Sequence, residues 1–160
     1  MAANSTVKPI SMETIKKLRE LTGAGVMDAK RALEDTNGDM EKAKDWIRAK
    51  GIQRAEKKSD REATAGVVGS YVHMGSQIAA LVELNCETDF VARTDDFITL
   101  AREIAMQTAS MDPKSVKELL EQPYIRDPKR TIEQCVKEIA GKVGENIVLK
   151  RFSRLTVGEK

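Results

Sequence analysis

The side chains that most often carry chemistry in proteins are few in this sequence. His73 is the only histidine of the chain, and no Ser or Cys motif accompanies it. A nucleophile with its base and orienting carboxylate therefore cannot be assembled around a histidine, and we expect His73 to be structural or a contact residue. Cys86 and Cys135 lack the spacing of a metal or redox motif, so we expect two free thiols and no metal or cofactor.

Two further patterns that could suggest catalysis have structural explanations. Asp95 and Asp96 are adjacent carboxylates, but they stand where a helical pattern begins, and acidic groups there satisfy free backbone N–H groups. The glycines of residues 23–25 follow no strand pattern and precede no Lys-Ser or Lys-Thr pair, unlike a phosphate-binding loop. We predict helix capping at the first pattern and a turn between helices at the second.

Residues 85–93, with the sequence NCETDFVAR, combine polar capping residues with apolar side chains. They link a strand-like run to a helix-like run, and such links usually lie at the surface. Phe90 beside Asp89 is then either a plug that folds back onto the core or a wedge that projects from it. The residue types alone favour the plug, because large aromatic side chains are usually buried.

Composition and charge favour a soluble protein with a protein partner. The 160 residues are 41% hydrophobic and 32% charged, which is typical of a globular fold. The 27 basic and 25 acidic residues give a net charge of only +2, which offers little attraction for nucleic acid. No apolar run is long enough to span a membrane, and residues 1–11 resemble neither a signal nor a transit peptide. We expect a cytoplasmic protein that binds neither membrane nor nucleic acid.

Residues 1–52 have the pattern of three short helices. After a polar lead ending at Pro9, Ser11 can cap the first helix, and Asn37 with Gly38 separates the second from a third that Asp39 can cap. Apolar residues recur at helical spacing in each helix: Ile15, Leu18 and Leu21, then Val26, Ala29 and Leu33, then Met40, Ala43, Trp46 and Ile47. We expect the third helix to end at Gly51.

Residues 53–65 have no large apolar side chain before the next strand pattern, so we predict a charged connector between two domains, either an exposed link or a solvated helix. Residues 66–160 then form a second domain. Two strand-like runs, 66–74 and 77–85, flank a Gly75-Ser76 turn, and a third run follows at 146–157. Helices are expected from Thr94 or Asp95 to Asp112, and from a capping box at Thr131 to Gly144. The predicted fold is α+β, with a small antiparallel sheet packed on helices.

Three segments carry a resemblance to a known family. TGAGVMDAKRAL at 22–33 and NCETDFVAR at 85–93 are similar to the two signatures of elongation factor Ts. GKVGENIVLKR at 141–151 resembles the end of that family's core domain. The segments occur in the family's order and are spread over most of the chain, from residue 22 to residue 151. The resemblance implies a cytoplasmic guanine nucleotide exchange factor, not an enzyme, that binds elongation factor Tu and releases its GDP so that GTP can load.

The resemblance also assigns roles to residues of the first domain. In that family the N-terminal three-helix module is similar to a ubiquitin-associated (UBA-like) domain and docks on the nucleotide domain of the partner. Carried over, Arg19, Val26 and Met27 are docking contacts. The alternative from the residues alone is that Val26 and Met27 belong to the helical core and that Arg19 is a solvated charge.

In the second signature, the resemblance favours the wedge. The family's loop enters beside the nucleotide site of the partner, which here assigns Thr88, Asp89, Phe90 and Val91 to displacing the bound Mg2+. Phe90 is then the inserted residue. An ordinary turn or helix cap remains the alternative for Thr88 and Asp89.

The sequence departs from longer members of this family. Those carry a second core subdomain and a protruding helical hairpin, and residues 111–129 leave no room for either. The contacts that longer members make through the hairpin are therefore not carried over. Because residues 69–82 resemble both subdomains, we predict that one copy stands for two in a homodimer whose sheets pair. His73 lies in this segment and is a candidate partner contact.

Two other classes of function remain open from the sequence. An interaction adaptor would use the three-helix module to recognise a different protein, and the second domain would only dimerise. RNA binding could use Lys150, Arg151 and Arg154 on the last strand, but few aromatic residues are available to stack on bases.

Overall fold

The computed structural model of the chain describes residues 10–158. The polar lead up to Pro9 lies outside the described residues. The chain divides into two compact units, Met1–Gly51 and Ile52–Lys160. Within the described part, every helix is too short or too polar to cross a membrane.

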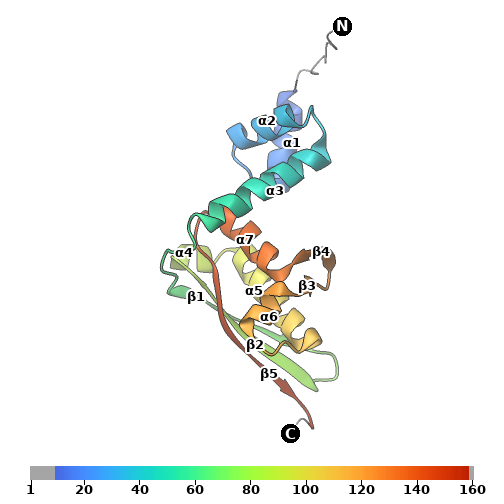
Figure 1. Cartoon of the computed structure of the whole chain (residues 1–160), viewed down its shortest axis with the longest axis vertical. Coiled ribbons are helices and arrows are strands. Elements are labelled where there is room, and N and C mark those ends of the chain that lie inside the picture. The colour runs from blue at the N-terminus through green and yellow to red at the C-terminus, as the bar shows by residue number, and fades with distance from the viewer. Residues whose placement is uncertain (1–9, 159–160) are drawn as a thin grey trace. The chain divides into compact units, whose positions relative to one another are not determined.

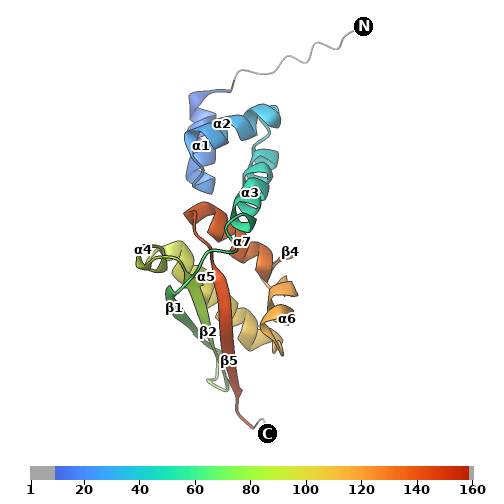
Figure 2. The same ribbon diagram turned by 60° about the vertical axis from the view of Figure 1, so that its left-hand side comes forward.

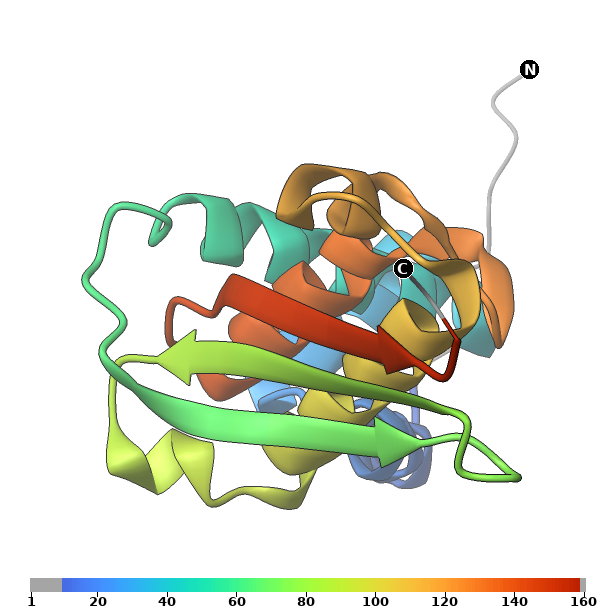
Figure 3. The same ribbon diagram turned by 90° about the horizontal axis from the view of Figure 1, so that it is seen from below.

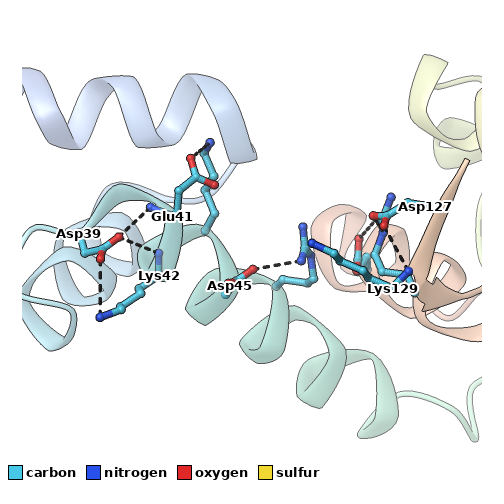
Figure 4. A network of polar contacts seen from close by, with 10 residues as sticks. Asp39, Glu41, Lys42, Asp45, Asp127 and Lys129 are labelled. Carbon is cyan, nitrogen blue, oxygen red and sulfur yellow. Dashed lines mark hydrogen bonds and ion pairs between the residues drawn. The ribbon is translucent and has the colours of Figure 1, made fainter.

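The first unit contains three helices, as the sequence predicts, and each begins at a recognisable signal. Helix α1 (Met12–Thr22) is capped by the Ser11 hydroxyl and ends at Gly23, whose φ of 70° is left-handed. Helix α2 is Val26–Asp35, and α3 is Met40–Glu56. The Asp39 carboxylate accepts from the backbone N–H groups of Glu41 and Lys42 at 3.1 Å each (Figure 4). The buried core of the unit consists of Ile15, Leu18, Ala29, Ala32, Leu33 and Ala43.

One expectation for this unit is wrong. Helix α3 does not end at Gly51 but continues to Glu56. A helical glycine costs only about 1 kcal/mol relative to alanine, and continuing the helix places Ala55 in the buried core of the second unit. Leu21 shares the helical spacing of Ile15 and Leu18, yet its side chain is exposed.

The second unit is built on a three-stranded antiparallel sheet, which confirms the predicted hairpin and third strand. Its strands are β1 (Ala65–Val72), β2 (Ile78–Cys86) and β5 (Val148–Thr156), in the order β1-β2-β5. Figure 3 shows β2 between its two neighbours. Gly75 and Ser76 both have positive φ in the turn from β1 to β2, so the turn residues were read correctly from the sequence.

The two faces of this sheet differ in exposure. The inner face carries Val67, Val82, Leu84 and Leu149, which pack in the core. The register of β2 and β5 shifts between Glu83 and Leu84: Glu83 pairs with Arg151, whereas Leu84 pairs with Leu149. Lys150 therefore has no residue opposite it in β2 and forms a bulge. This bulge reverses the alternation of β5 beyond Lys150. The outer face is lined by rows that cross the strands: Val68, Glu83 and Arg151; Ser70, Leu81 and Ser153; Val72, Ala79 and Leu155.

Helices cover the inner face of the sheet, so the unit is an α+β fold as predicted. Helix α5 (Asp95–Met111) packs on β1 and β2, and α7 (Ile132–Val143) packs on α5 (Figures 1 and 2). The predicted capping box is present at the start of α7, where Thr131 and Gln134 bond to each other's backbone N–H groups. Phe97, Ile104, Leu119 and Ile132 are among the fully buried side chains of this core.

The segment from α5 to α7 contains structure that the sequence analysis did not predict. It forms α6 (Val116–Glu121) and a small hairpin of β3 (Pro123–Tyr124) and β4 (Asp127–Thr131). The buried Gln107 amide of α5 holds this segment. Its nitrogen donates to Gln122 and to the Pro123 carbonyl at 3.1 Å each, and its oxygen accepts from the Ile125 N–H at 3.0 Å.

Candidate functional site

The link from β2 to α5 contains a single helical turn, α4 (Asp89–Ala92). Thr88 is its N-cap, with the Thr88 hydroxyl accepting from the Val91 N–H at 3.4 Å. At the other end, the Thr94 hydroxyl donates to the Val91 carbonyl at 2.8 Å. A turn of four residues is far below the length at which a helix is stable alone, so tertiary contacts must hold it.

Burial divides this turn into an anchor and an exposed part. Val91 and Ala92 are each only 4% exposed and belong to the core of the second unit. Because successive residues of a helix are about 100° apart, burying these two turns Asp89 and Phe90 toward solvent. Phe90 is 82% exposed, an unusual position for a large aromatic side chain. The plug interpretation of Phe90 is therefore excluded, and Val91 occupies the buried position instead.

The loop before α4 is held by Glu145, which lies just after α7. The Glu145 carboxylate accepts from the N–H groups of Glu87 and Thr88 at 3.1 and 3.0 Å. It also accepts from the Thr88 hydroxyl at 2.6 Å. Hydrogen bonds to a charged acceptor are stronger than those between neutral groups. One side chain thus fixes two successive residues of the loop.

A second carboxylate closes the same junction in the opposite direction. The Asn146 N–H donates to the Glu87 carboxylate at 2.7 Å. The Asn146 side chain is buried, and its amide donates to the carbonyls of Ser59 and Arg61 at 3.1 and 2.7 Å. Residues 59–61, 87–88 and 145–146 therefore meet at one polar junction beside the exposed ring.

The thiol next to this loop is not a nucleophile. Cys86 is fully buried at the end of β2, and its Sγ donates to the Thr88 carbonyl at 3.2 Å. Burial raises the pKa of the Cys86 thiol, and the negative charge of Glu145 raises it further. The thiol is therefore protonated at neutral pH, whereas a reactive cysteine needs the thiolate. Cys86 and Cys135 are both free and buried.

The candidate docking residues of the first unit lie at its surface. Met27 is 75% exposed, and Val26 is also exposed, so neither belongs to the helical core. Arg19 is exposed, and its Nε donates to the Ala24 carbonyl at 3.3 Å in the turn before α2. Leu21 is exposed as well, so four exposed residues, Arg19, Leu21, Val26 and Met27, lie at the end of α1 and the start of α2.

His73 lies far from the exposed ring. It follows β1, and its N–H donates to the Ile78 carbonyl at the start of β2, whereas Phe90 follows the end of β2. The eight steps between the first and last residues of β2 separate the two ends by roughly 27 Å at about 3.4 Å per step. The exposed His73 ring forms a hydrogen bond with Tyr71, with 3.2 Å between His73 Nδ1 and the Tyr71 hydroxyl oxygen, and the tautomer of the ring decides which group donates. The structure therefore does not bring His73 together with Phe90.

A cavity of about 310 Å3 lies between α5 and α7, and it includes no residue of the Phe90 loop. Polar groups in its wall pair with one another: the Tyr124 hydroxyl donates to Glu103 at 2.6 Å, and Arg130 contacts Glu138 at 2.7 Å. Burial and the Glu103 charge raise the pKa of Tyr124. Among residues 10–158, no group of three or more His, Cys, Asp or Glu side chains is arranged to hold a metal ion.

Glu145, Glu87 and Asn146 are residues of this site that were not predicted from the sequence. Glu145 and Asn146 lie in residues 141–151, which resemble the end of the family's core domain but suggest no role for either side chain. Both residues directly follow Gly144, where α7 ends. No spacing pattern links them to Thr88, because 57 residues separate Thr88 from Glu145. An acidic residue after a glycine helix stop was the one available signal.

The chain is similar to proteins of one family. The family model described as Elongation factor TS matches residues 87–160, a range that includes both the loop and Glu145. Elongation factor Ts from Synechococcus sp. (strain RCC307) is 42% identical over 196 residues, which cover 94% of this chain and 90% of the relative. Elongation factor Ts from Prochlorococcus marinus (strain MIT 9211) has the same identity and coverage.

These relatives are longer than the present chain. Their alignment extends over 196 positions, whereas the chain has 160 residues, so they carry residues that this chain lacks. Elongation factor Ts from Nostoc sp. (strain PCC 7120 / SAG 25.82 / UTEX 2576) is 47% identical over 151 residues. That alignment covers 94% of this chain but 48% of the relative.

Proposed function

Because the chain belongs to the elongation factor Ts family, we propose that it is a guanine nucleotide exchange factor of translation elongation. It binds elongation factor Tu carrying GDP, promotes GDP release and allows GTP to load. It acts in the cytoplasm by binding and forms or breaks no covalent bond. The observation that carries this proposal is the exposed Phe90 ring on a loop that the core holds in place.

Phe90 is the residue that enters the nucleotide site of the partner. Its ring is exposed while Val91, the next residue, is buried, so the loop can present the ring without moving its own anchor. Thr88 shapes the loop as the cap of α4, and Asp89 places a negative charge beside the ring. Of the four candidate residues, Phe90 and Asp89 can contact the partner. Val91, through its burial in the core, and Thr88, through its cap of α4, keep these two residues in position.

The target of this wedge is the magnesium ion of the partner. In such GTPases, Mg2+ bridges nucleotide phosphates and protein oxygens and neutralises phosphate charge. Insertion of Phe90 beside that site displaces the ion, and loss of its positive charge lowers the affinity for GDP. The ion belongs to the partner, and the factor itself needs no metal.

The energetics favour two regions of contact. A thousandfold faster release of GDP offsets on the order of 4 kcal/mol of nucleotide binding. Burial of one Phe side chain gains roughly 1.5 to 3 kcal/mol, so the ring alone is insufficient. Docking of the first unit through Arg19, Val26 and Met27 supplies the remainder. By linkage, GDP weakens the binding of the factor by the same ratio, which makes the cycle reversible.

The open face of the sheet supports a homodimer. Val68, Val72, Leu81 and Leu155 are all exposed on this face, and the strand register places them on neighbouring rows. An exposed apolar face of this kind marks an interface. A second copy of the chain is its occupant, because a twofold axis can place the same apolar face of two copies against each other. His73, beyond the end of β1, is a candidate contact to elongation factor Tu from this assembly.

The proposal is tested by the release of fluorescent GDP from elongation factor Tu, measured by stopped flow. Native protein accelerates release, and Phe90→Ala and Asp89→Ala lower the rate. Phe90→Ala lowers it by at least about tenfold, because the variant lacks the ring that becomes buried in the complex. Ile98→Ala is the matched control, because Ile98 is an exposed apolar residue outside the loop.

The same measurements distinguish the competing functions. An adaptor leaves the release of GDP unchanged by native protein and by every variant. An RNA-binding protein retards RNA in a salt-sensitive manner and has no effect on GDP. Either result would overturn the assignment of exchange activity.

A further inference from the structure

The junction beside the Phe90 loop is a reciprocal clasp between two segments. Glu145 accepts three hydrogen bonds from Glu87 and Thr88, and Glu87 in turn accepts one from the Asn146 N–H. Each segment thus uses a carboxylate to bind the backbone of the other. No hydrogen bond of this clasp involves Phe90 itself, so the clasp acts on the ring only through the backbone of the loop.

The position of Glu145 depends on the end of α7. Gly144 ends that helix with a left-handed φ of 79°, and the Lys58 ammonium donates to its carbonyl. The chain reverses there, which turns Glu145 toward the loop and buries Asn146 against residues 59–61. Glu145 is therefore itself held from both sides, and it can impose its geometry on Thr88.

We propose that Glu145 is a positioning residue for nucleotide exchange, which fixes Thr88 and thereby the direction in which Phe90 projects. This inference rests on the proposed function, and it adds a residue from the other end of the domain to the exchange loop. Two features favour this role. Helix α4 is too short to set its own orientation, and the Glu145 carboxylate accepts hydrogen bonds from Glu87 and Thr88, the two residues that precede α4. Glu145 does not touch the partner in this arrangement but acts through Thr88.

Loss of the Glu145 charge should affect the maximal exchange rate but not the concentration of factor that gives half of that rate. Docking through the first unit does not involve the clasp, so the concentration of factor that gives half of the maximal exchange rate stays within about twofold of native in Glu145→Gln. The maximal rate falls by about tenfold, because a wedge that samples several directions is productive in only a fraction of complexes. A general loss of folding would instead change both quantities and the unfolding midpoint together.

The direction of the ring is measured without any partner by 19F NMR of protein containing fluorophenylalanine. The chain has three Phe residues, and Phe90→Leu assigns the signal of position 90. In Glu145→Gln and Thr88→Val we expect that signal to shift or narrow toward the value of a freely moving ring, while the signals of Phe97 and Phe152 stay unchanged. Thr88→Ser keeps the hydroxyl, so in contrast to Thr88→Val it should give the native signal and the native exchange rate.

The matched control is a carboxylate on the surface of the same unit that takes no part in the clasp. Glu121→Gln removes the charge of an exposed carboxylate on α6 and leaves both measurements unchanged. If the native protein is active and Glu145→Gln keeps the native maximal rate and the native Phe90 signal, the positioning role is wrong while the exchange function stands. If the native protein does not accelerate GDP release at all, the proposed function is overturned and the role of Glu145 with it.

Discussion

Gly69 of β1 lies directly against the backbone of Ala101 in α5. A Cβ atom at Gly69 would be 2.6 Å from the Ala101 carbonyl oxygen and 2.7 Å from its carbon. The strand and the helix therefore approach each other as closely as their main chains allow. This contact sets how deeply α5 sits on the sheet, and so positions the start of α5 that follows the Phe90 loop.

We expect Gly69→Ala to destabilise the second unit by about 1 to 3 kcal/mol, because the added methyl group meets backbone atoms that cannot rotate away. Urea unfolding followed by circular dichroism measures this change. Ser70→Ala is the control, since Ser70 is the next residue of β1 and faces solvent. An unchanged urea midpoint in Gly69→Ala would show that α5 can shift without cost.

Val91→Ala and Phe90→Ala should separate stability from activity at neighbouring positions. Val91 is buried, and its truncation removes two carbons at about 0.8 kcal/mol each, so we expect a loss of about 1.6 kcal/mol in the free energy of unfolding. Phe90 is exposed, and its truncation should change stability by no more than about 0.5 kcal/mol. Urea titrations of the two variants test this, and equal destabilisation would contradict the division into anchor and wedge.

Leu81→Asp should convert the proposed homodimer into a monomer. Leu81 lies in the middle strand on the open face, where a buried carboxylate would have no partner. Light scattering after gel filtration should give twice the chain mass of 17.7 kDa for native protein and the single mass for the variant. Ile98→Asp is matched in exposure, 48% against 51% for Leu81, and should remain a dimer. A native monomer at micromolar concentration would refute the sheet pairing.

The stability of the first unit should fall in acid through Asp39. The hydrogen bond from the Lys42 N–H holds the pKa of Asp39 below its ordinary value of 3.8. A carboxylate with a depressed pKa in the folded state stabilises the fold above its unfolded pKa, and this contribution is lost as the pH falls through the folded pKa. We therefore expect the loss to begin below about pH 4.

Trp46 is the only tryptophan of the chain and packs against the core of the first unit, so its fluorescence reports on that unit. Asp39→Asn keeps an oxygen that can cap α3 but does not titrate. The stability of its first unit, followed by this fluorescence, should therefore fall less than that of native protein as the pH drops below about 4. Identical acid profiles of native protein and Asp39→Asn would exclude the cap as the source of the effect.

Local signals in the sequence predicted most of the elements. Ser11, Asp39 and Thr131 were each read as helix caps, and each caps a helix, because a side chain needs to reach only two or three residues along its own chain to do so. The alternation of apolar residues predicted the hairpin in the same way. The segments that resemble elongation factor Ts are likewise contiguous, and the relatives bear out that family.

Features that depend on distant residues were not predictable from these patterns. Gly51 continues a helix because Ala55 finds a place in another core. The hairpin of β3 and β4 is held by Gln107, which lies 16 residues before Pro123. Lys150 forms a bulge only because β5 pairs with β2. In each case a tertiary contact overrides or adds to a local preference.

The site shows the same division. The residue types were sufficient to identify the segment that carries Phe90, because cap residues and apolar residues stand side by side in residues 85–93. Whether the ring is buried or projects depends on contacts with distant residues, since one turn of helix can bury either Phe90 or its neighbour Val91. Val91 fills the core and Glu145 holds Thr88 across 57 residues, and these two contacts leave Phe90 in solvent.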